Sequence, residues 1–254
     1  MRYVSTLGSA PVLGFSDVVL AGLATDGGLY VPESWPSLPA DLPDGYAGLA
    51  AAVFAPFAGD DFTAADLNRL TASAYSTFRH PDVVPLVPLE DGHSLMELFH
   101  GPTLAFKDVA LQFLGRLFDE ILTARGERVT IVGATSGDTG SAAIDGVRGC
   151  ANVDIVILYP HGRVSEVQRR QMTTVDEPNV HTVAVDGTFD DCQDLVKAMF
   201  NDAIFRERNR LSAVNSINWA RVAAQIPYYV AAALALGAPD REVAFAVPTG
   251  NFGN

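Results

Sequence analysis

The 254-residue chain contains few cysteines, an excess of acidic over basic residues and no apolar run long enough to span a membrane. Its two cysteines, Cys150 and Cys192, do not follow the spacing of a metal site, and we identify no metal site elsewhere. We expect reduced, partly buried thiols rather than a disulfide, which is typical of a cytoplasmic protein. The first ten residues lack the basic start and apolar run of a secretory signal.

Negative charge outweighs positive charge, because 30 Asp and Glu residues against 17 Lys and Arg residues give a formal charge of −13. An acidic chain repels phosphate backbones and anionic lipids, which argues against nucleic acid or a membrane as the main partner. A site for an anion must then be built locally, for example from backbone amides at the start of a helix. The longest apolar stretch, Tyr228 to Ala238, is predicted to be a buried helix.

A hydrophobic content of 48% is sufficient for a sizeable core. Prolines are expected to break regular structure from Val31 to Pro56, and an amphipathic pattern predicts one or two helices over Asp61 to Phe78. A cluster of prolines then favours an extended conformation for Val83 to Leu89. We therefore predict a small helical N-terminal unit, residues 1–85, followed by a second domain, residues 86–254.

From Ser94 onward, short β-branched segments alternate with helical patterns. Strands are predicted at Ser94 to Phe99, Arg128 to Gly133, Asp154 to Tyr159, Val180 to Val185 and Val243 to Val247. Helices are predicted at Lys107 to Arg125, Gly137 to Arg148, Ser165 to Val175 and Phe189 to Arg208. This alternation indicates an α/β fold, a parallel sheet with flanking helices, which binds ligands at the carboxyl ends of its strands.

Lys107 lies in an apolar segment, Phe99 to Asp108. Burial disfavours a charged amine, so a lysine in such surroundings can attack a carbonyl and form a Schiff base. Pyridoxal phosphate is the commonest partner in that chemistry. The alternative is an ordinary lysine at a helix start, with its stem packed and its ammonium group in water. His93 and His100 flank this segment without an evident carboxylate partner.

The segment Thr135 to Gly140 joins a predicted strand to a predicted helix. Its glycines allow close approach of the backbone, and free amides at the helix start attract an anion. An ordinary turn capped by Ser136 is the alternative explanation of the same residues.

Three more segments have a structural explanation, and the first two also have a functional one. The glycine-rich turn Gly250 to Asn254 can surround a phosphate with backbone amides, or can be a plain turn. Ser216 to Arg221 starts a helix that either contributes to a site or only places Trp219 in the core. Ser165 and Gln168 match a capping box, which explains their helix start without a further role.

Taken together, these segments resemble those of threonine synthases, and Phe15 to Pro32 resembles the beginning of that family. The resemblance implies a pyridoxal-phosphate fold of the tryptophan-synthase β type. It also implies conversion of O-phospho-L-homoserine and water to L-threonine and phosphate, with Lys107 as cofactor attachment point and catalytic residue. It places the cofactor's phosphate at Gly250, Asn251, Phe252, Gly253 and Asn254. It assigns substrate binding to Thr135, Ser136, Gly137, Asp138, Thr139, Asn218 and Arg221.

The resemblance also implies a chain cut short, because members of that family continue well beyond the phosphate-binding turn. We therefore expect a fragment whose large domain is incomplete and which is inactive or impaired by itself. Two other functions stay open at this point. One is a phospho-lyase that gives 2-oxobutanoate, and the other is an inactive paralogue that keeps the fold.

Overall fold

The structure is a computed structural model and describes residues 1–214 and 218–248. Strand β1 (Tyr3–Ser5) pairs antiparallel with β2 (Tyr30–Pro32), and α1 (Phe15–Ala21) lies between them in sequence. Two longer helices follow, α2 (Tyr46–Ala58) and α3 (Ala64–Tyr75), joined by the 3-10 turn η1 (Gly59–Asp61). The N-terminal part is therefore mainly helical, as the sequence predicts.

The prediction of irregular structure up to Pro56 is wrong, because α2 contains that proline. Pro56 lies in the last turn and the helix ends two residues later, so the missing amide disturbs little of the helix. Most of the α2 side chains are apolar, and Phe54 and Ala58 are almost completely buried. Burial of this face outweighs the local cost of one proline.

The predicted strand Ser94 to Phe99 is shorter than expected and does not belong to the parallel sheet. Instead β3 (Leu86–Pro88) and β4 (Ser94–Met96) form an antiparallel hairpin across the turn η2 (Glu90–Gly92). Asp91 and Gly92 have positive φ angles of 56° and 74°, which reverse the chain within a few residues. The correction follows from this turn, because two strands joined so closely can only pair antiparallel.

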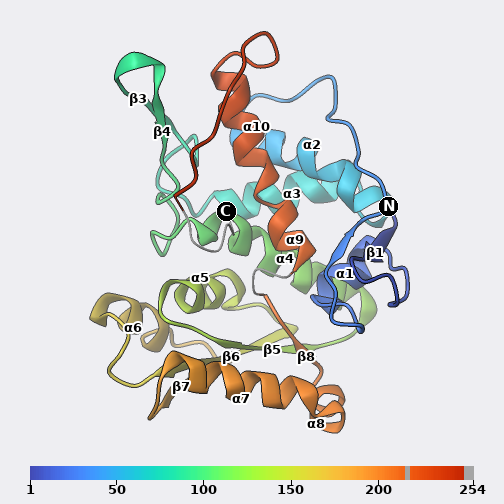
Figure 1. Ribbon diagram of the computed structural model, residues 1–254, viewed down its shortest axis with the longest axis vertical. Helices are drawn as coiled ribbons and strands as arrows, with labels where there is room; N and C mark the ends of the chain where they lie inside the picture. The colour runs from blue at the N-terminus through green and yellow to red at the C-terminus, as the bar shows by residue number, and fades with distance from the viewer. Residues whose placement is uncertain (215–217, 249–254) are drawn as a thin grey trace.

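A four-stranded parallel sheet forms the second part of the molecule, with the strand order β7-β6-β5-β8. Its strands are β5 (Val129–Ala134), β6 (Val153–Pro160), β7 (Val180–Val185) and β8 (Leu211–Ser212). Its connecting helices are α5 (Asp138–Val147), α6 (Glu166–Thr173), α7 (Phe189–Asn201) and α8 (Ala203–Arg208). Figure 1 shows α5 and α6 on one face of the sheet and α7 and α8 on the other.

The predicted helix Phe189 to Arg208 is divided in two at Asp202, whose carboxylate accepts the Phe205 amide and starts α8. The predicted Ser165–Gln168 capping box is only half formed: the Ser165 hydroxyl accepts the Gln168 amide, but the Gln168 side chain bonds the Ser165 hydroxyl and not its backbone. Local sequence therefore sets where these helices begin, while the interruption at Asp202 was not expected.

The last described part of the chain returns to the N-terminal helices through α9 (Trp219–Ala223) and α10 (Ile226–Ala235). Only one face of α10 is buried, with Tyr228 at 0% and Leu234 at 41% exposure. The predicted buried strand Val243 to Val247 is wrong, because these residues pair with no strand in the described chain and Phe245 is 41% exposed. An apolar β-branched sequence needs a neighbouring strand to form a ladder, and among residues 1–214 and 218–248 no strand pairs with this segment.

One hydrophobic core joins the N-terminal helices to α4 (Lys107–Arg125), α5 and α9. Phe54 of α2 meets Phe113 of α4 edge to face with ring centroids 4.9 Å apart, and Phe57 packs on Trp219 at 5.8 Å. A domain boundary near residue 85 stays a prediction. Both cysteines are free thiols, and none of the described helices is long and apolar enough to cross a membrane.

Candidate active site

Lys107 and Asp138 meet at the starts of two helices. Lys107 is the first residue of α4, and its ammonium group pairs with the carboxylate of Asp138, the first residue of α5. The lysine side chain is only 14% exposed, and Nζ lies 5.1 Å from the centre of the Phe106 ring. The apolar surroundings predicted for Lys107 are therefore present on one side, while a carboxylate that the sequence did not pair with it stands on the other.

The start of α5 forms a compact turn around Thr135, which is almost completely buried. Its hydroxyl accepts the backbone amides of Gly137 and Gly140, both at 2.9 Å. Thr135 therefore caps this turn, and Ser136, the capping residue considered from sequence, is exposed. Gly137 has a φ of 147°, where glycine is favoured, and the Gln168 side chain fills the space that a side chain at position 137 would need.

Two amides at the start of α5 are left to face a ligand. Asp138 and Thr139 occupy the first two positions of the helix, where a backbone N–H has no acceptor within the helix. Both residues line the cavity described below. An anion of carboxylate size at this place meets two backbone donors and the positive end of the α5 dipole.

Arg221 adds a buried cation to the same place. The residue is 4% exposed, lies on α9, and donates from Nη1 to the carbonyl of Val214 at 3.4 Å. Burial lowers the pKa of its guanidinium, and the nearby carboxylate of Asp138 raises it. Because an arginine stays charged at neutral pH, this side chain brings a positive charge into the wall of the cavity.

Asn218 has a different position from the other predicted substrate residues. It is completely buried, donates to the carbonyl of Val19 at 2.9 Å and accepts the amide of Ala220 at 3.0 Å. It therefore caps α9 and ties it to α1. Its side chain is not among those that line the cavity, so its contribution is to hold the helix that carries Arg221.

These groups surround a cavity of about 1240 Å³ at the carboxyl end of β5, between α1, α5, α7 and α8. Six of the predicted site residues line it: Lys107, Thr135, Ser136, Asp138, Thr139 and Arg221. Sequence reasoning missed three further cations in its wall, Lys197 on α7, Arg206 on α8 and Arg210 just before β8, none of which belongs to a motif. The predicted phosphate turn, Gly250 to Asn254, lies outside the described residues.

The charge of the cavity is opposite to that of the chain. Five cationic side chains line it, against two carboxylates, Asp138 and Glu207, although the formal charge of the whole chain is −13. The local anion site expected from the sequence is therefore present as a positively charged wall.

One histidine prediction needs correction. His100 does have a carboxylate partner, since its Nε2 lies 2.7 Å from the Glu97 carboxylate. Glu97 is only three residues earlier, in the segment between β4 and α4. The short spacing in sequence could therefore have indicated this pair.

Comparison with known proteins shows which proteins this chain is similar to. Residues 2–75 match the family described as threonine synthase N terminus. The whole chain aligns with 55% of a threonine synthase of Pseudomonas aeruginosa at 58% identity over 265 residues. It also superimposes on 56% of a PLP-bound threonine synthase of Brucella melitensis, with a TM-score of 0.95 and 58% identity. A yeast threonine synthase gives a TM-score of 0.90 at 45% identity over 99% of this chain and 53% of that one. The chain thus spans about half the length of the relatives that it matches.

Proposed function

We propose that this chain, which has the sequence and the fold of the N-terminal portion of threonine synthases, supplies the Schiff-base lysine of such an enzyme. The reaction is the conversion of O-phospho-L-homoserine and water to L-threonine and phosphate, with pyridoxal phosphate as cofactor. The observation that carries the proposal is the meeting of Lys107, Asp138 and Arg221 in one cavity at the carboxyl end of β5. That edge is where parallel sheets bind ligands.

The residues present suit pyridoxal phosphate. Lys107 offers its amine to the cofactor's aldehyde carbon in a cavity of about 1240 Å³, which has room for a cofactor and a substrate. When bound, the cofactor supplies an electron sink for the bonds around the substrate's Cα. Gly250 to Asn254 are the residues that we propose for its phosphate group.

Lys107 accepts and releases a proton at Nζ, and Asp138 stabilises its protonated form. The amine is a base at the right place for the substrate's Cα proton, because it lies where the substrate amine must enter. When Nζ carries the proton, the Asp138 carboxylate stabilises the ammonium group through the ion pair between the two side chains. The Phe106 ring beside Nζ limits the access of water to the amine.

The substrate has two anionic ends, and the cavity offers a separate group for each. We assign its carboxylate to the turn Thr135 to Thr139, where the amides of Asp138 and Thr139 point from the start of α5. We assign its phosphate to Arg221, whose guanidinium can bind two oxygens at once. Asn218 supports Arg221 by capping α9.

Two organisational proposals accompany this function. The helical segment, residues 1–85, is proposed as the N-terminal domain and residues 86–254 as part of the catalytic domain. A cytoplasmic enzyme that acts on a small molecule is consistent with two free thiols, Cys150 and Cys192, and with the acidic charge of the chain.

A titration with O-phospho-L-homoserine tests the proposal. The chain loaded with pyridoxal phosphate is expected to change its visible absorption on addition of the substrate, and Arg221→Gln is expected to need a higher substrate concentration for the same change. L-Homoserine, which is the same molecule without the phosphate group, is the matched control and should be bound almost equally by both proteins. If the chain turns the substrate over, equal amounts of threonine and phosphate support the assignment and 2-oxobutanoate contradicts it. An absorption that does not respond to the substrate contradicts it as well.

A further inference from the structure

The loop that precedes Lys107 is held by one residue, Thr103, whose three polar groups are all bonded. The carboxylate of Asp108 accepts the Thr103 amide at 2.8 Å and the Thr103 hydroxyl at 2.6 Å. The side-chain amide of Gln171, on α6, donates to the Thr103 carbonyl at 3.0 Å. Two helices therefore fix one residue of the loop between them.

Asp108 makes these contacts from a completely buried position. Within the described residues, its carboxylate makes two hydrogen bonds, both to Thr103, and no salt bridge. Burial raises the pKa of this carboxyl from 3.8 to about 6, the Thr103 bonds lower it, and Asp145 on the neighbouring α5 raises it. A buried, ionised carboxylate without a cation destabilises the folded state. We therefore look for the role of Asp108 in its two hydrogen bonds to Thr103.

The backbone around Asp108 is built for this contact. A side chain at Gly101 would overlap that of Asp108, so only glycine lets the loop approach so closely. Leu104 has a φ of 65°, an uncommon conformation for a residue with a Cβ atom. The surrounding contacts thus keep the loop in a shape that it would not adopt alone.

Helix α6 contacts both the loop that precedes Lys107 and the turn Thr135 to Gly140 at the start of α5. Gln171 bonds the lysine loop at Thr103, while the next residue, Met172, is completely buried. Its Sδ lies in the space that a side chain at Gly140 would enter, so Met172 packs against the start of α5. The same short helix therefore sets the distance between Lys107 and the turn that carries Asp138.

We propose that Asp108 is a positioning residue for Lys107. Through Thr103 it fixes the loop and the first turn of α4, so that Lys107 Nζ lies beside Asp138 at the cavity. The catalytic meaning of this role rests on the proposed function, but the positioning itself is a property of the chain and can be measured without cofactor.

The chain is convenient for such a measurement because it has only two lysines, Lys107 and Lys197. The Lys107 side chain is 14% exposed, whereas that of Lys197 is 67% exposed and pairs with Asp194 at 3.0 Å. Trace acetylation with limiting acetic anhydride, read by peptide mass spectrometry, gives the ratio of the two labels in one sample. Lys197 thus acts as an internal standard for the reactivity of Lys107.

The variants to compare are Asp108→Ala, Asp108→Asn and Thr103→Val. Each Thr103 bond that is lost is expected to raise the Lys107-to-Lys197 ratio about three- to tenfold, which is the equilibrium effect of one hydrogen bond. Asp108→Asn keeps one acceptor oxygen and should give a smaller rise than Asp108→Ala. The matched control is Asp119→Asn, because Asp119 lies on the same helix and accepts the Asn152 amide at 3.0 Å, away from the loop.

The ratio separates the possible outcomes. A rise in the Thr103 and Asp108 variants, without a rise in Asp119→Asn, supports the positioning role. If these variants fold by circular dichroism and change the ratio no more than Asp119→Asn does, the role is refuted; Thr103→Val decides if the Asp108 variants do not fold. Borohydride reduction with pyridoxal phosphate tests the proposed function separately. Failure of wild-type Lys107 to take the cofactor, with an intact acetylation effect, rejects that function and leaves the positioning role standing.

Discussion

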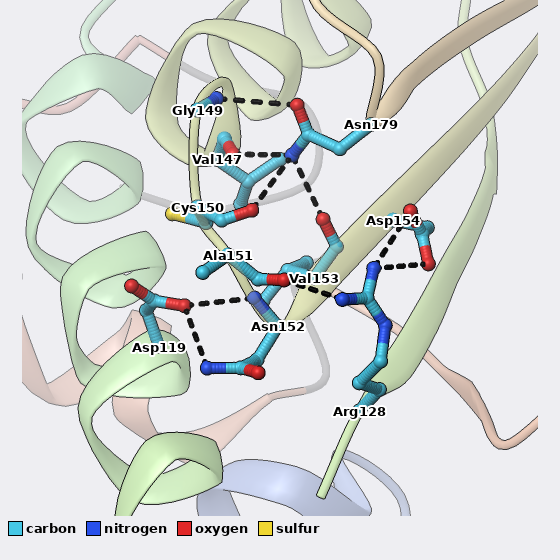
Figure 2. A network of polar contacts seen from close by, with 10 residues as sticks. All are labelled: Asp119, Arg128, Val147, Gly149, Cys150, Ala151, Asn152, Val153, Asp154 and Asn179. Atoms are coloured by element: carbon cyan, nitrogen blue, oxygen red, sulfur yellow. Dashed lines mark hydrogen bonds and ion pairs between the residues drawn. The ribbon is translucent and has the colours of Figure 1, made fainter.

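The two ends of the four-stranded sheet use similar polar residues in opposite ways. At the amino-terminal end, Figure 2 shows the side-chain amide of Asn179 donating to the carbonyls of Val147 at 2.9 Å and Val153 at 2.8 Å. Its oxygen accepts the amide of Gly149 at 3.2 Å. One asparagine side chain therefore joins the end of α5 to the start of β6.

The neighbouring charged side chains at that end also form hydrogen bonds or ion pairs with other groups of the protein. Asp119 accepts the amide of Asn152 at 3.0 Å, and Arg128 donates to the carbonyl of Ala151 at 2.6 Å while pairing with Asp154 at 3.1 Å. At the carboxyl end, by contrast, Lys107 and Arg221 face a cavity. Polar groups thus stabilise the fold where neighbours in the chain satisfy them, and are available for chemistry where they line open space.

The largest effect is expected for Lys107→Ala. Removal of the Lys107 amine should abolish covalent attachment of pyridoxal phosphate at this position, because Schiff-base formation requires this amine. The visible absorption of the loaded protein measures the loss. Lys197→Ala is the matched control and should keep the absorption; a Lys107→Ala protein that still binds the cofactor as a Schiff base would remove the distinction between the two ends.

Asn179→Ala should mainly weaken the fold. The buried carbonyls of Val147 and Val153 and the amide of Gly149 lose their partner, and the expected decrease in the free energy of unfolding is about 3 kcal/mol. Denaturant unfolding measures it, with Asn68→Ala as the control, since Asn68 is exposed and bonds only the Ala64 carbonyl. Labelling of Lys107 should not change while the protein is folded. Equal effects of the two substitutions would contradict the structural role of Asn179.

Asp108→Asn should reveal a pH dependence of opposite sign to that of a stabilising carboxylate. The folded-state pKa of Asp108 is about 6, above its ordinary value of 3.8, so the folded chain binds more protons than the unfolded chain between these values. The stability of the wild type relative to the variant should therefore fall as the pH rises from about 4 to 6, by about 2–3 kcal/mol. Unfolding of both proteins across this range measures the difference. A difference that does not vary with pH would show that Asp108 is not buried in its ionised form.

Thr135→Val should have the smallest of these effects. The substitution keeps the shape of the side chain but removes the hydroxyl that accepts the amides of Gly137 and Gly140. Loss of a helix cap is expected to decrease the free energy of unfolding by about 1–2 kcal/mol. Thr135→Ser retains the hydroxyl and serves as the control in the same denaturant experiment. If both variants unfold alike, the cap contributes little and the turn is held by its packing.

Much of the sheet region could be predicted because its signals are local. The helix Lys107 to Arg125 has the predicted bounds, since its amphipathic pattern ends at Gly126, which adopts the left-handed conformation with a φ of 66°. The strand Val180 to Val185 also has the predicted bounds. The hairpin at β3 and β4 and the unpaired Val243 to Val247 were mispredicted, because strand pairing depends on which segments meet in space.

The sequence predicted several residues of the site, but it did not predict which of them contact one another. Lys107 and Asp138 were selected from separate motifs, yet their ion pair joins residues 31 positions apart and depends on how α4 packs on α5. The hydrogen bonds between Thr103 and Asp108 were not predicted, although these residues are only five positions apart. A threonine and an aspartate at this spacing are too common to indicate a contact, which only the glycine at position 101 permits.

We propose that Lys107, at the carboxyl end of the sheet, is the amine that reacts with pyridoxal phosphate. Borohydride reduction of the chain with an equimolar amount of the cofactor, followed by peptide mapping, tests it most directly because Lys107 and Lys197 are the only lysines. We expect one pyridoxyl group per chain on Lys107 and little label on the more exposed Lys197. Label that follows exposure, with Lys197 modified first and Lys107 left free, would contradict it.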